Sequence, residues 1–331
     1  MAAFLHPLDK LRPGHESFEP ASSASRPRVG LVLSSGGAKG LAHIGVIQVL
    51  EENGIEVDVV AGTSMGAYVG GLFAAGFNGK ELESFAADMT RKRDLLDLVD
   101  PVFPPRRGFL RGRSIYERLD KSLQGKTFAE LEKPFLAVAT EFETLERAVI
   151  RTGEVASAIV ASLAVPGVVV PVVRNGVEYI DGGVCDPLPV SLAKKTWDLD
   201  HVIAVNVLPP IGSLREAKAG DRGSRVWLKP LQFLNRHLNY FARGNLLDIL
   251  RAAAMGSQMR LVGKSAREAD VLISPMSPKS GWHDYHRYAD YIEIGRAAAL
   301  EALPKIKALL GKEKSVAPEL PTLNRIEMSC I

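Results

Sequence analysis

The chain has 331 residues, of which 46% are hydrophobic and 24% charged, and its formal net charge at pH 7 is +3. That length can bury one large core, and so small a net charge gives no support for a nucleic-acid partner. There is no run of eighteen apolar residues, and the two cysteines, Cys185 and Cys330, offer neither a disulfide framework nor metal-ligand spacing. We therefore expect a cytoplasmic globular protein without a membrane-spanning segment.

The first 27 residues are rich in proline and serine, which is typical of a disordered tail. A catalytic domain is predicted over residues 28–208, and it begins with the buried-strand pattern Val29-Gly30-Leu31-Val32-Leu33. A glycine-rich loop follows, then apolar residues at helical spacing up to Leu50, then a second strand over residues 55–61. Such a β-loop-α-β unit implies parallel strands joined by a right-handed crossover.

The second strand leads directly into Gly62-Thr63-Ser64-Met65-Gly66, and a small-residue helical pattern follows to Ala75. Strand, sharp turn and helix is the setting of a nucleophile elbow, in which glycines flank a serine whose hydroxyl projects from the turn. We predict that Ser64 is a catalytic nucleophile and that Gly62 and Gly66 are required by the turn. A neutral serine hydroxyl also needs a positioned base.

Further strands are predicted over residues 134–140, 147–151, 177–180 and 201–207, with helices over residues 80–89, 114–124 and 155–163. This alternation predicts an α/β fold with a mixed, mostly parallel sheet. One strand ends at Asp181, which Gly182 and Gly183 follow. A carboxylate at the carboxyl end of a strand lies where open α/β sheets place their ligand crevice, although a lone Asp-Gly is otherwise a simple turn.

Residues 209–310 are predicted to form a helical extension with one last strand, packed on the same core, and residues 311–331 a frayed tail. Between Arg215 and Arg243, seven basic residues stand against two acidic ones and alternate with aromatic and leucine side chains. The stretch fits a solvated helical face. It equally fits an interfacial element in which apolar side chains enter a membrane boundary and Arg and Lys meet anionic headgroups.

The glycine-rich loop Gly36-Gly37-Ala38-Lys39-Gly40 stands between a strand and a helix. Consecutive backbone N–H groups can converge there on one point, reinforced by the positive end of the helix dipole. Such a loop binds a phosphate or stabilises an oxyanion. The P-loop pattern fails because Gly40 follows Lys39 where Ser or Thr is needed. A non-enzymatic phosphate-binding module is therefore a weak alternative.

Together these motifs resemble those of the patatin-like phospholipases: a glycine-rich loop, then Gly-x-Ser-x-Gly, then Asp-Gly-Gly, 117 residues beyond the serine. The resemblance runs from about Val29 to Val190 and includes Ala161-Ser162-Leu163-Ala164-Val165-Pro166-Gly167, similar to the family's Ser-x-x-x-Pro-Gly segment. Trp282-His283-Asp284-Tyr285-His286 is similar to an element of the short bacterial members. Two positions depart from the pattern: Ser35 stands where many members have a first glycine, and Asp186-Pro187 replaces an Asn-rich pair.

The resemblance implies a three-layer α/β/α fold and a lipid acyl hydrolase that uses a Ser-Asp dyad with no histidine, metal or cofactor. Ser64 would attack the ester carbonyl, and Asp181 would accept its proton and later activate the deacylating water. The N–H groups of Gly36, Gly37 and Ala38 would hold the oxyanion. Lys39, Gly40, Gly62, Gly66, Gly182 and Gly183 would support these motifs. The substrate would be a phospholipid or lysophospholipid, met at the inner face of the membrane.

The nearest enzymatic alternative is an α/β-hydrolase with the chain order Ser, Asp, His. Asp181 with His283 or His286 would satisfy that order, and replacing His201, His237, His283 and His286 singly would test it. In that fold the nucleophile normally follows several strands, whereas Ser64 follows the second. His43, in the first predicted helix, is expected to be a packed residue.

Overall fold

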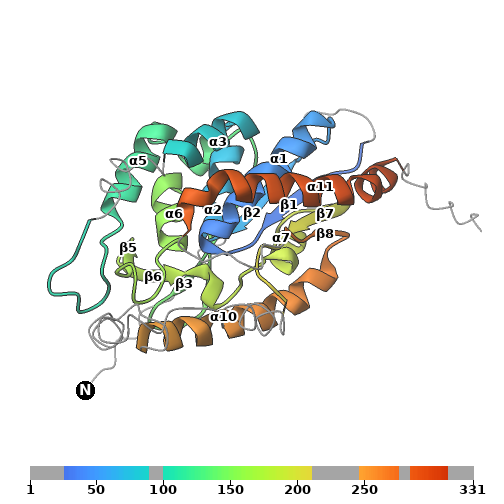
Figure 1. Cartoon of the computed structure of the whole chain (residues 1–331). Coiled ribbons are helices and arrows are strands. Elements are labelled where there is room, and N and C mark those ends of the chain that lie inside the picture. Colours follow the sequence, from blue (N-terminus) through green and yellow to red (C-terminus); the bar gives the residue numbers. More distant parts are fainter. Residues whose placement is uncertain (1–25, 89–99, 211–245, 276–283, 312–331) are drawn as a thin grey trace, which may run out of the picture.

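The computed structural model describes residues 26–88, 100–210, 246–275 and 284–311 (Figure 1). The expectations for residues 215–243, His237, His283 and Cys330 concern positions outside these ranges. Within the described part of the chain, no helix combines the length and the hydropathy needed to cross a membrane.

An eight-stranded sheet forms the middle layer, in the order β5-β6-β3-β2-β1-β7-β8, with β4 also paired to β3. Its strands are β1 (Val29–Leu33), β2 (Val59–Thr63), β3 (Phe135–Glu141), β4 (Arg147–Ile150), β5 (Val172–Arg174), β6 (Val177–Asp181), β7 (His201–Val205) and β8 (Val271–Ile273). The pairs β3-β2, β2-β1, β1-β7 and β7-β8 are parallel, whereas β3-β4, β3-β6 and β5-β6 are antiparallel. The predicted mixed, mostly parallel sheet is confirmed.

Helices cover both faces of this sheet (Figure 1). The α-helices are α1 (Ala42–Glu52), α2 (Met65–Ala74), α3 (Gly79–Asp88), α5 (Arg113–Leu123), α6 (Val155–Ser162), α7 (Val190–Thr196), α10 (Leu246–Ser265) and α11 (Tyr288–Leu310). Short 3-10 turns are η1 (Gly37–Leu41), η2 (Phe128–Glu130), η3 (Gly182–Val184), η5 (Ala266–Glu268) and η6 (Tyr285–Arg287).

Side chains alternate between the two faces of the sheet and fill two hydrophobic clusters. Leu31 and Leu33 of β1 belong to the larger cluster with α1, α2, α6 and α11, whereas Val32 belongs to the smaller one with α7 and α10. The central strands are buried on both faces, which is why they read as nearly continuous apolar runs. The result is the three-layer α/β/α architecture.

The C-terminal described residues join this same core. The strand β8 pairs with β7 in the sheet, and α11 packs against α1. The two helices approach at two glycines: a Cβ on Gly45 would lie 1.9 Å from Ile292 O, and one on Gly295 would lie 2.0 Å from Ala42 O. Side chains larger than hydrogen at these positions would force the helices apart.

Candidate active site

Ser64 and Asp181 come together because β2 and β6 end at adjacent positions along β3. Ser64 directly follows β2, and Asp181 is the last residue of β6. Thr63, the last residue of β2, pairs with Val138, and Asp181, the last residue of β6, pairs with Ala139. The opposite edge of β3 is occupied by β4 over these same positions, so β2 and β6 lie in line on one edge. Since β2 is parallel and β6 antiparallel to β3, their carboxyl ends meet head-on.

Ser64 occupies a sharp turn between β2 and α2. Its φ of 55° and ψ of −122° are rarely adopted by residues other than glycine. Two hydrogen bonds through Ser162 link the turn to β3: Ser64 N donates to Ser162 Oγ at 2.8 Å, and Ser162 Oγ donates to Val138 O at 2.6 Å. Ser64 also precedes the first turn of α2, so its hydroxyl lies at the positive end of that helix.

The two glycines that flank Ser64 are fixed by close backbone contacts. A Cβ on Gly62 would lie 2.3 Å from Gly66 O, and a Cβ on Gly66 would lie 2.2 Å from Leu33 O. Neither contact leaves room for a side chain. The nucleophile elbow predicted from the sequence therefore has the local geometry that its glycines suggest.

The serine hydroxyl is bonded directly to the aspartate. Ser64 Oγ donates to Asp181 Oδ2 at 2.5 Å, and both side chains are buried. The other carboxylate oxygen, Oδ1, accepts the N–H of Gly183 at 2.6 Å, and Asp181 N donates to Ala164 O at 2.9 Å. A Cβ on Gly182 would lie 2.1 Å from Val138 O, so the Asp-Gly-Gly turn also packs closely against β3.

Burial raises the pKa of Asp181 from 3.8 to about 6, although the hydrogen bonds from Ser64 and from Gly183 N–H favour the carboxylate. An aspartate with an ordinary pKa would be a much weaker acceptor for a serine proton. At neutral pH this carboxyl group is still ionised, and it has a higher proton affinity than an exposed aspartate.

The turn after Asp181 is also hydrogen-bonded to the last residue of β2, just before Ser64. Thr63 Oγ1 donates to Asp186 O at 2.8 Å, and the Asp186 side chain accepts from Arg147 at 2.6 Å. Thr140 Oγ1 donates to Asp181 O at 3.0 Å and also lies 3.1 Å from Cys185 Sγ. Burial raises the pKa of the Cys185 thiol. Asp186, which stands where the family pattern has an Asn-rich pair, thus places a carboxylate in an ion pair with Arg147 beside the site.

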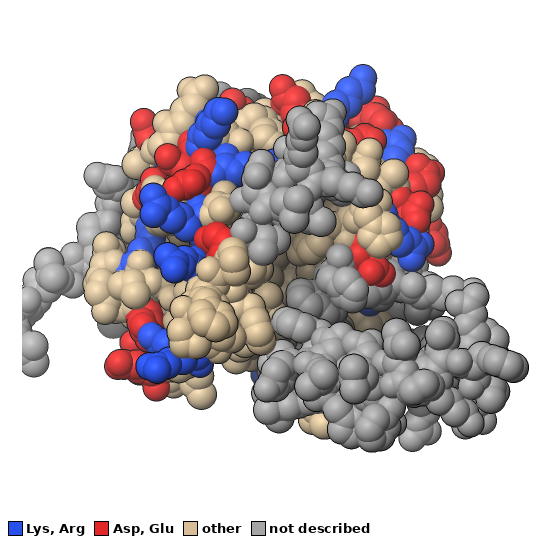
Figure 2. All heavy atoms as spheres, turned by 60° about the vertical axis from the view of Figure 1, so that its left-hand side comes forward, with Lys and Arg blue, Asp and Glu red and all other residues tan. Residues whose placement is uncertain are grey.

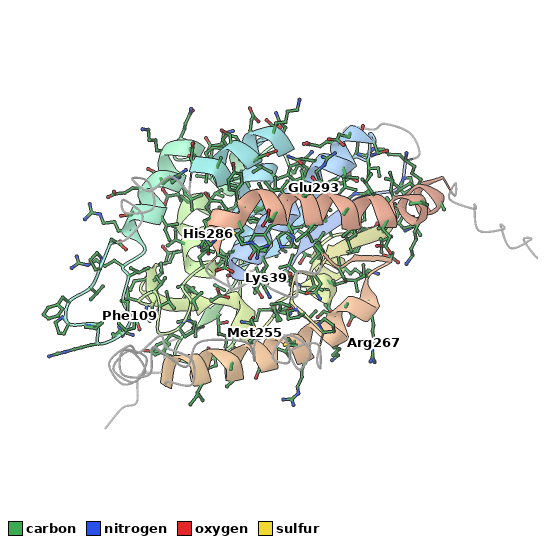
Figure 3. All side chains as sticks on the ribbon, viewed as in Figure 1. Lys39, Phe109, Met255, Arg267, His286 and Glu293 are labelled. Atoms are coloured by element: carbon green, nitrogen blue, oxygen red, sulfur yellow. The ribbon has the colours of Figure 1, made fainter. Side chains whose placement is uncertain are left out.

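The glycine-rich loop forms η1 next to the elbow and contacts α2 and α11. A Cβ on Gly40 would lie 2.4 Å from Met65 Cγ, so this glycine lets the loop approach the residue after Ser64. Among the described residues, the N–H groups of Gly36, Gly37 and Ala38 donate none of the loop and turn hydrogen bonds. Lys39 is half-buried and lies near the middle of the molecule (Figure 3).

Ser35, where the family pattern has glycine, is buried, and its Oγ has no hydrogen-bond partner among the described residues. Its hydroxyl lies beside the Asp-Gly-Gly turn. The Cβ position of Gly183 is 3.1 Å from Ser35 Oγ, 2.9 Å from Asp181 Oδ1 and 2.8 Å from Gln258 Nε2. Gln258 belongs to α10, so that helix brings an amide group to the aspartate's side of the site.

The described histidines are not bonded to either dyad residue. His201 begins β7 and pairs with Val29, at the end of the sheet opposite to Ser64. His286 is exposed in η6, just before α11 (Figure 3). His43 is buried, Nε2 lies 2.9 Å from Ser34 O, and burial lowers its pKa to about 4.

Ser162 and two tyrosines near the site were not predicted from the residues. Ser162 lies at the end of α6, and only its place in a resembling motif singled it out. Tyr68 on α2 is buried, and the nearby half-buried Tyr285 feels the negative charge of Asp181. Burial raises the pKa of each tyrosine to about 12, so both remain neutral phenols.

The sequence of residues 31–194 matches the family model described as patatin-like phospholipase. An uncharacterised NTE family protein of Mycobacterium tuberculosis (strain H37Rv) is 40% identical over 186 residues, covering 55% of this chain and 50% of that protein. Lysophospholipase NTE1 of Candida albicans is 28% identical over 312 residues, covering 88% of this chain and 22% of that protein. The chain thus spans half or less of the length of these relatives. Among solved structures, VipD from Legionella pneumophila superposes with a TM-score of 0.45 at 17% identity, covering 86% of this chain and 68% of that one.

Proposed function

Residues 31–194 belong to the patatin-like phospholipase family, and on this premise we propose that the protein is a serine acyl hydrolase that cleaves carboxyl-ester bonds of phospholipids or lysophospholipids. The observation that carries the proposal is the 2.5 Å hydrogen bond from Ser64 Oγ to Asp181 Oδ2, buried at the meeting point of β2 and β6. Nucleophile and base are already in contact, as general-base activation of a serine requires.

In the acylation step, Ser64 Oγ attacks the ester carbonyl carbon as its proton passes to Asp181 Oδ2. The raised pKa of Asp181 helps this transfer, and the N–H of Gly183 keeps the carboxylate oriented. The tetrahedral intermediate then collapses, the ester C–O bond breaks, and the proton on Asp181 goes to the departing alcohol oxygen. Ser64 is left as an acyl ester.

In the deacylation step, a water molecule takes the place of the alcohol. Asp181 accepts a proton from the water as its oxygen attacks the acyl carbon, and the proton then returns to Ser64 Oγ when the acyl–serine bond breaks. The products are a fatty acid and the regenerated dyad. No third side chain is needed for this proton balance.

The oxyanion in both steps would be held by N–H groups of Gly36, Gly37 and Ala38. Support comes from their place at the start of η1, beside the elbow, and from their lack of loop hydrogen-bond acceptors among the described residues. Losing one oxyanion donor typically slows the chemical step about 100-fold to 1,000-fold.

A phospholipid or lysophospholipid is proposed as substrate on the strength of the family and of the Candida albicans relative, which is named a lysophospholipase. Hydrolysis of lysophospholipid micelles and of a water-soluble short-chain ester tests the activity. Ser64→Ala should abolish both hydrolyses and keep the fold. The matched control is Ser122→Ala, on α5, whose hydroxyl donates to Arg118 O and has no other hydrogen bond among the described residues. Full activity in Ser64→Ala would refute the proposal.

A Ser-Asp-His triad makes a different prediction. It requires a histidine between Ser64 and the carboxylate, but Asp181 itself occupies the hydrogen-bonding position on Ser64 Oγ. We expect His286→Gln and His283→Gln to keep turnover within about threefold of wild type, whereas Asp181→Asn should lower it by a factor of about 100 or more. A collapse in either histidine variant would favour the triad.

A further inference from the structure

Residues 101–112 form a projecting arm that leads into α5, and this arm extends away from the body of the molecule (Figure 1). Its two sides are joined near its base, where Val102 N donates to Phe109 O at 2.8 Å and Arg111 N donates to Asp100 O at 3.0 Å. Asp100 also accepts the N–H groups of Gly112 and Arg113 at 3.0 and 2.6 Å, which fixes the arm to the start of α5.

The base of the arm forms backbone hydrogen bonds with residues 168–170, in the segment that follows Ser162. Phe109 N and Leu110 N both donate to Val168 O at 2.9 Å, and Val170 N donates to Leu110 O at 2.9 Å. A Cβ on Gly108 would lie 2.7 Å from Val170 N, so the contact is close. The arm is therefore attached to the segment whose Ala164 O binds the backbone of Asp181.

An ion pair holds the arm against the antiparallel edge of the sheet. The two guanidinium nitrogens of Arg107 donate to the two carboxylate oxygens of Glu178, on β6, at 2.8 and 2.6 Å. The same guanidinium lies 5.5 Å from the centre of the Phe142 ring. These contacts fix the orientation of the arm relative to β6, which carries Asp181 at its other end.

The arm combines an exposed aromatic side chain at its tip with two arginines, one at the tip and one near the base, that have no carboxylate partner among the described residues. Phe103 is 94% exposed and is followed by Pro104 and Pro105. Arg106 and Arg111 are exposed and form no ion pair within the described part of the chain. Figure 2, which turns this side of the molecule forward, shows an uncharged surface bordered by both basic and acidic side chains.

We propose that the arm, residues 101–112, docks the protein on an anionic lipid surface, with Phe103 entering the boundary between headgroups and acyl chains and Arg106 and Arg111 binding lipid phosphates. This inference deepens the proposed function, because it supplies a way for a lipid substrate to reach Ser64, and it rests on that function.

A lipid surface fits the arm better than water or a protein pocket does. A single exposed phenylalanine raised on a projecting loop can enter a fluid interface without a preformed cavity, and free guanidinium groups beside it attract anionic headgroups. The nearby β3–β4 turn also exposes Leu145, but Glu143 and Glu146 flank it. Those carboxylates are repelled by anionic lipid, so the arm, and not that turn, is the contact.

Vesicle co-sedimentation of the full chain in the Ser64→Ala background tests the arm without hydrolysis of the lipid. The probes are vesicles of phosphatidylcholine alone and vesicles containing phosphatidylglycerol. We expect Phe103→Ala to weaken binding about tenfold on the phosphatidylglycerol vesicles, because most of the transfer free energy of one phenylalanine is lost. Arg106→Glu with Arg111→Glu should weaken it at least as much and remove the preference for anionic lipid.

Two controls keep this test separate from the test of the hydrolase activity. Leu300→Ala removes a half-exposed leucine on α11 and should bind vesicles as the parent does. In an otherwise wild-type chain, Phe103→Ala should hydrolyse a water-soluble short-chain ester at the wild-type rate. The inference is overturned if the parent binds neither vesicle, or if the arm variants bind as tightly as the parent. Equal binding by the parent to both kinds of vesicle would also contradict it.

Discussion

The Asp181 carboxyl group meets two opposing requirements in one residue. Burial beside Ser64 raises its proton affinity, which the proposed chemistry needs, but the same burial opposes ionisation and therefore costs folding free energy at neutral pH. Two hydrogen bonds, from Ser64 Oγ and Gly183 N, offset part of this cost. Both consequences can be measured.

The first prediction concerns the pH dependence of catalysis. Because the base must be ionised and its pKa is about 6, kcat/KM for a neutral, water-soluble ester should fall about tenfold per pH unit below pH 6 and be level above pH 7. Stopped-flow or plate assays across pH 4 to 9 measure this. A profile without an inflection near pH 6 would contradict the assignment of Asp181.

The second prediction is that Asp181→Asn stabilises the fold while removing activity. The folded-state pKa lies above the unfolded value of 3.8, so the stabilisation from protonation is complete below pH 4 and is lost as pH rises through 6. The asparagine side chain of the variant cannot ionise, so the difference in unfolding free energy between variant and wild type should be about 2 kcal/mol more favourable to the variant at pH 8 than at pH 4. Denaturant titrations at pH 4 and 8 provide the comparison, and a pH-independent difference would count against it.

The third prediction concerns Ser162, whose hydroxyl bonds to the backbone on both sides. Ser162→Ala leaves Ser64 N and Val138 O unpaired in the buried turn. We expect a loss of about 2 kcal/mol in unfolding free energy and a drop in kcat larger than the change in KM. Ser157→Ala, earlier on α6, is the control, because its half-buried hydroxyl also bonds on two sides, to Glu154 O and from Arg174 Nε, but has no bond to the Ser64 turn. Equal effects of the two substitutions would deny Ser162 its supporting role.

At the scale of elements, the site depends on two strands that end at neighbouring positions of β3. The sequence predicted both ends, at Ser64 and Asp181, and placed them at one edge by analogy with parallel strands. The register Thr63↔Val138 and Ala139↔Asp181 shows a different reason, since β6 runs antiparallel and meets β2 head-on. Pairing partners and strand direction depend on contacts distant in sequence, so local patterns could not supply them.

Short elements were the other gap in the sequence-based prediction. Among the described residues, the strand β5 has three residues after Pro171 and pairs with β6 alone. The helix α7 has seven residues that begin after Pro189. Neither is long enough to repeat a hydrophobic period. The strands β1, β2 and β3 and the helices α1 and α11 were predictable because their apolar patterns are long or unbroken.

The fourth prediction compares two glycines within helices. Ala normally stabilises a helix by about 1 kcal/mol relative to Gly, and Gly263→Ala, exposed near the end of α10, should show a gain of this order. Gly66→Ala places a methyl group 2.2 Å from Leu33 O and should cost several kcal/mol and most of the activity. Thermal unfolding of both variants, with an ester-hydrolysis assay of Gly66→Ala, measures these two opposite effects. A stable, active Gly66→Ala would show that the elbow is not close-packed.

At the scale of the whole molecule, the family-matched residues share their core with the described C-terminal elements. The strand β8 extends the sheet beyond β7, and the buried side chains of α11 lie in the same hydrophobic cluster as those of α1. Sequence periodicity predicted these elements and their packing on one core. It could not show the contact at Gly45 and Gly295, because that contact depends on how two distant helices cross.

The fifth prediction follows from this shared core. Tyr291 on α11 is one of the largest fully buried side chains, so Tyr291→Ala should lower the unfolding free energy by about 3–5 kcal/mol, whereas Leu300→Ala on the same helix should change it little. Ester hydrolysis and far-UV circular dichroism should be lost together in one urea transition. Separate transitions would indicate that α11 folds independently of the site.

The central claim, that Ser64 is the nucleophile and Asp181 its base, is tested most directly by covalent labelling. A fluorophosphonate should label the wild-type protein once, on Ser64 by peptide mass spectrometry. The labelling rate should follow the ionisation of a group with a pKa of about 6, and Asp181→Asn should slow labelling at least about 100-fold. Labelling of any residue other than Ser64, or an undiminished rate in Asp181→Asn, would contradict the account.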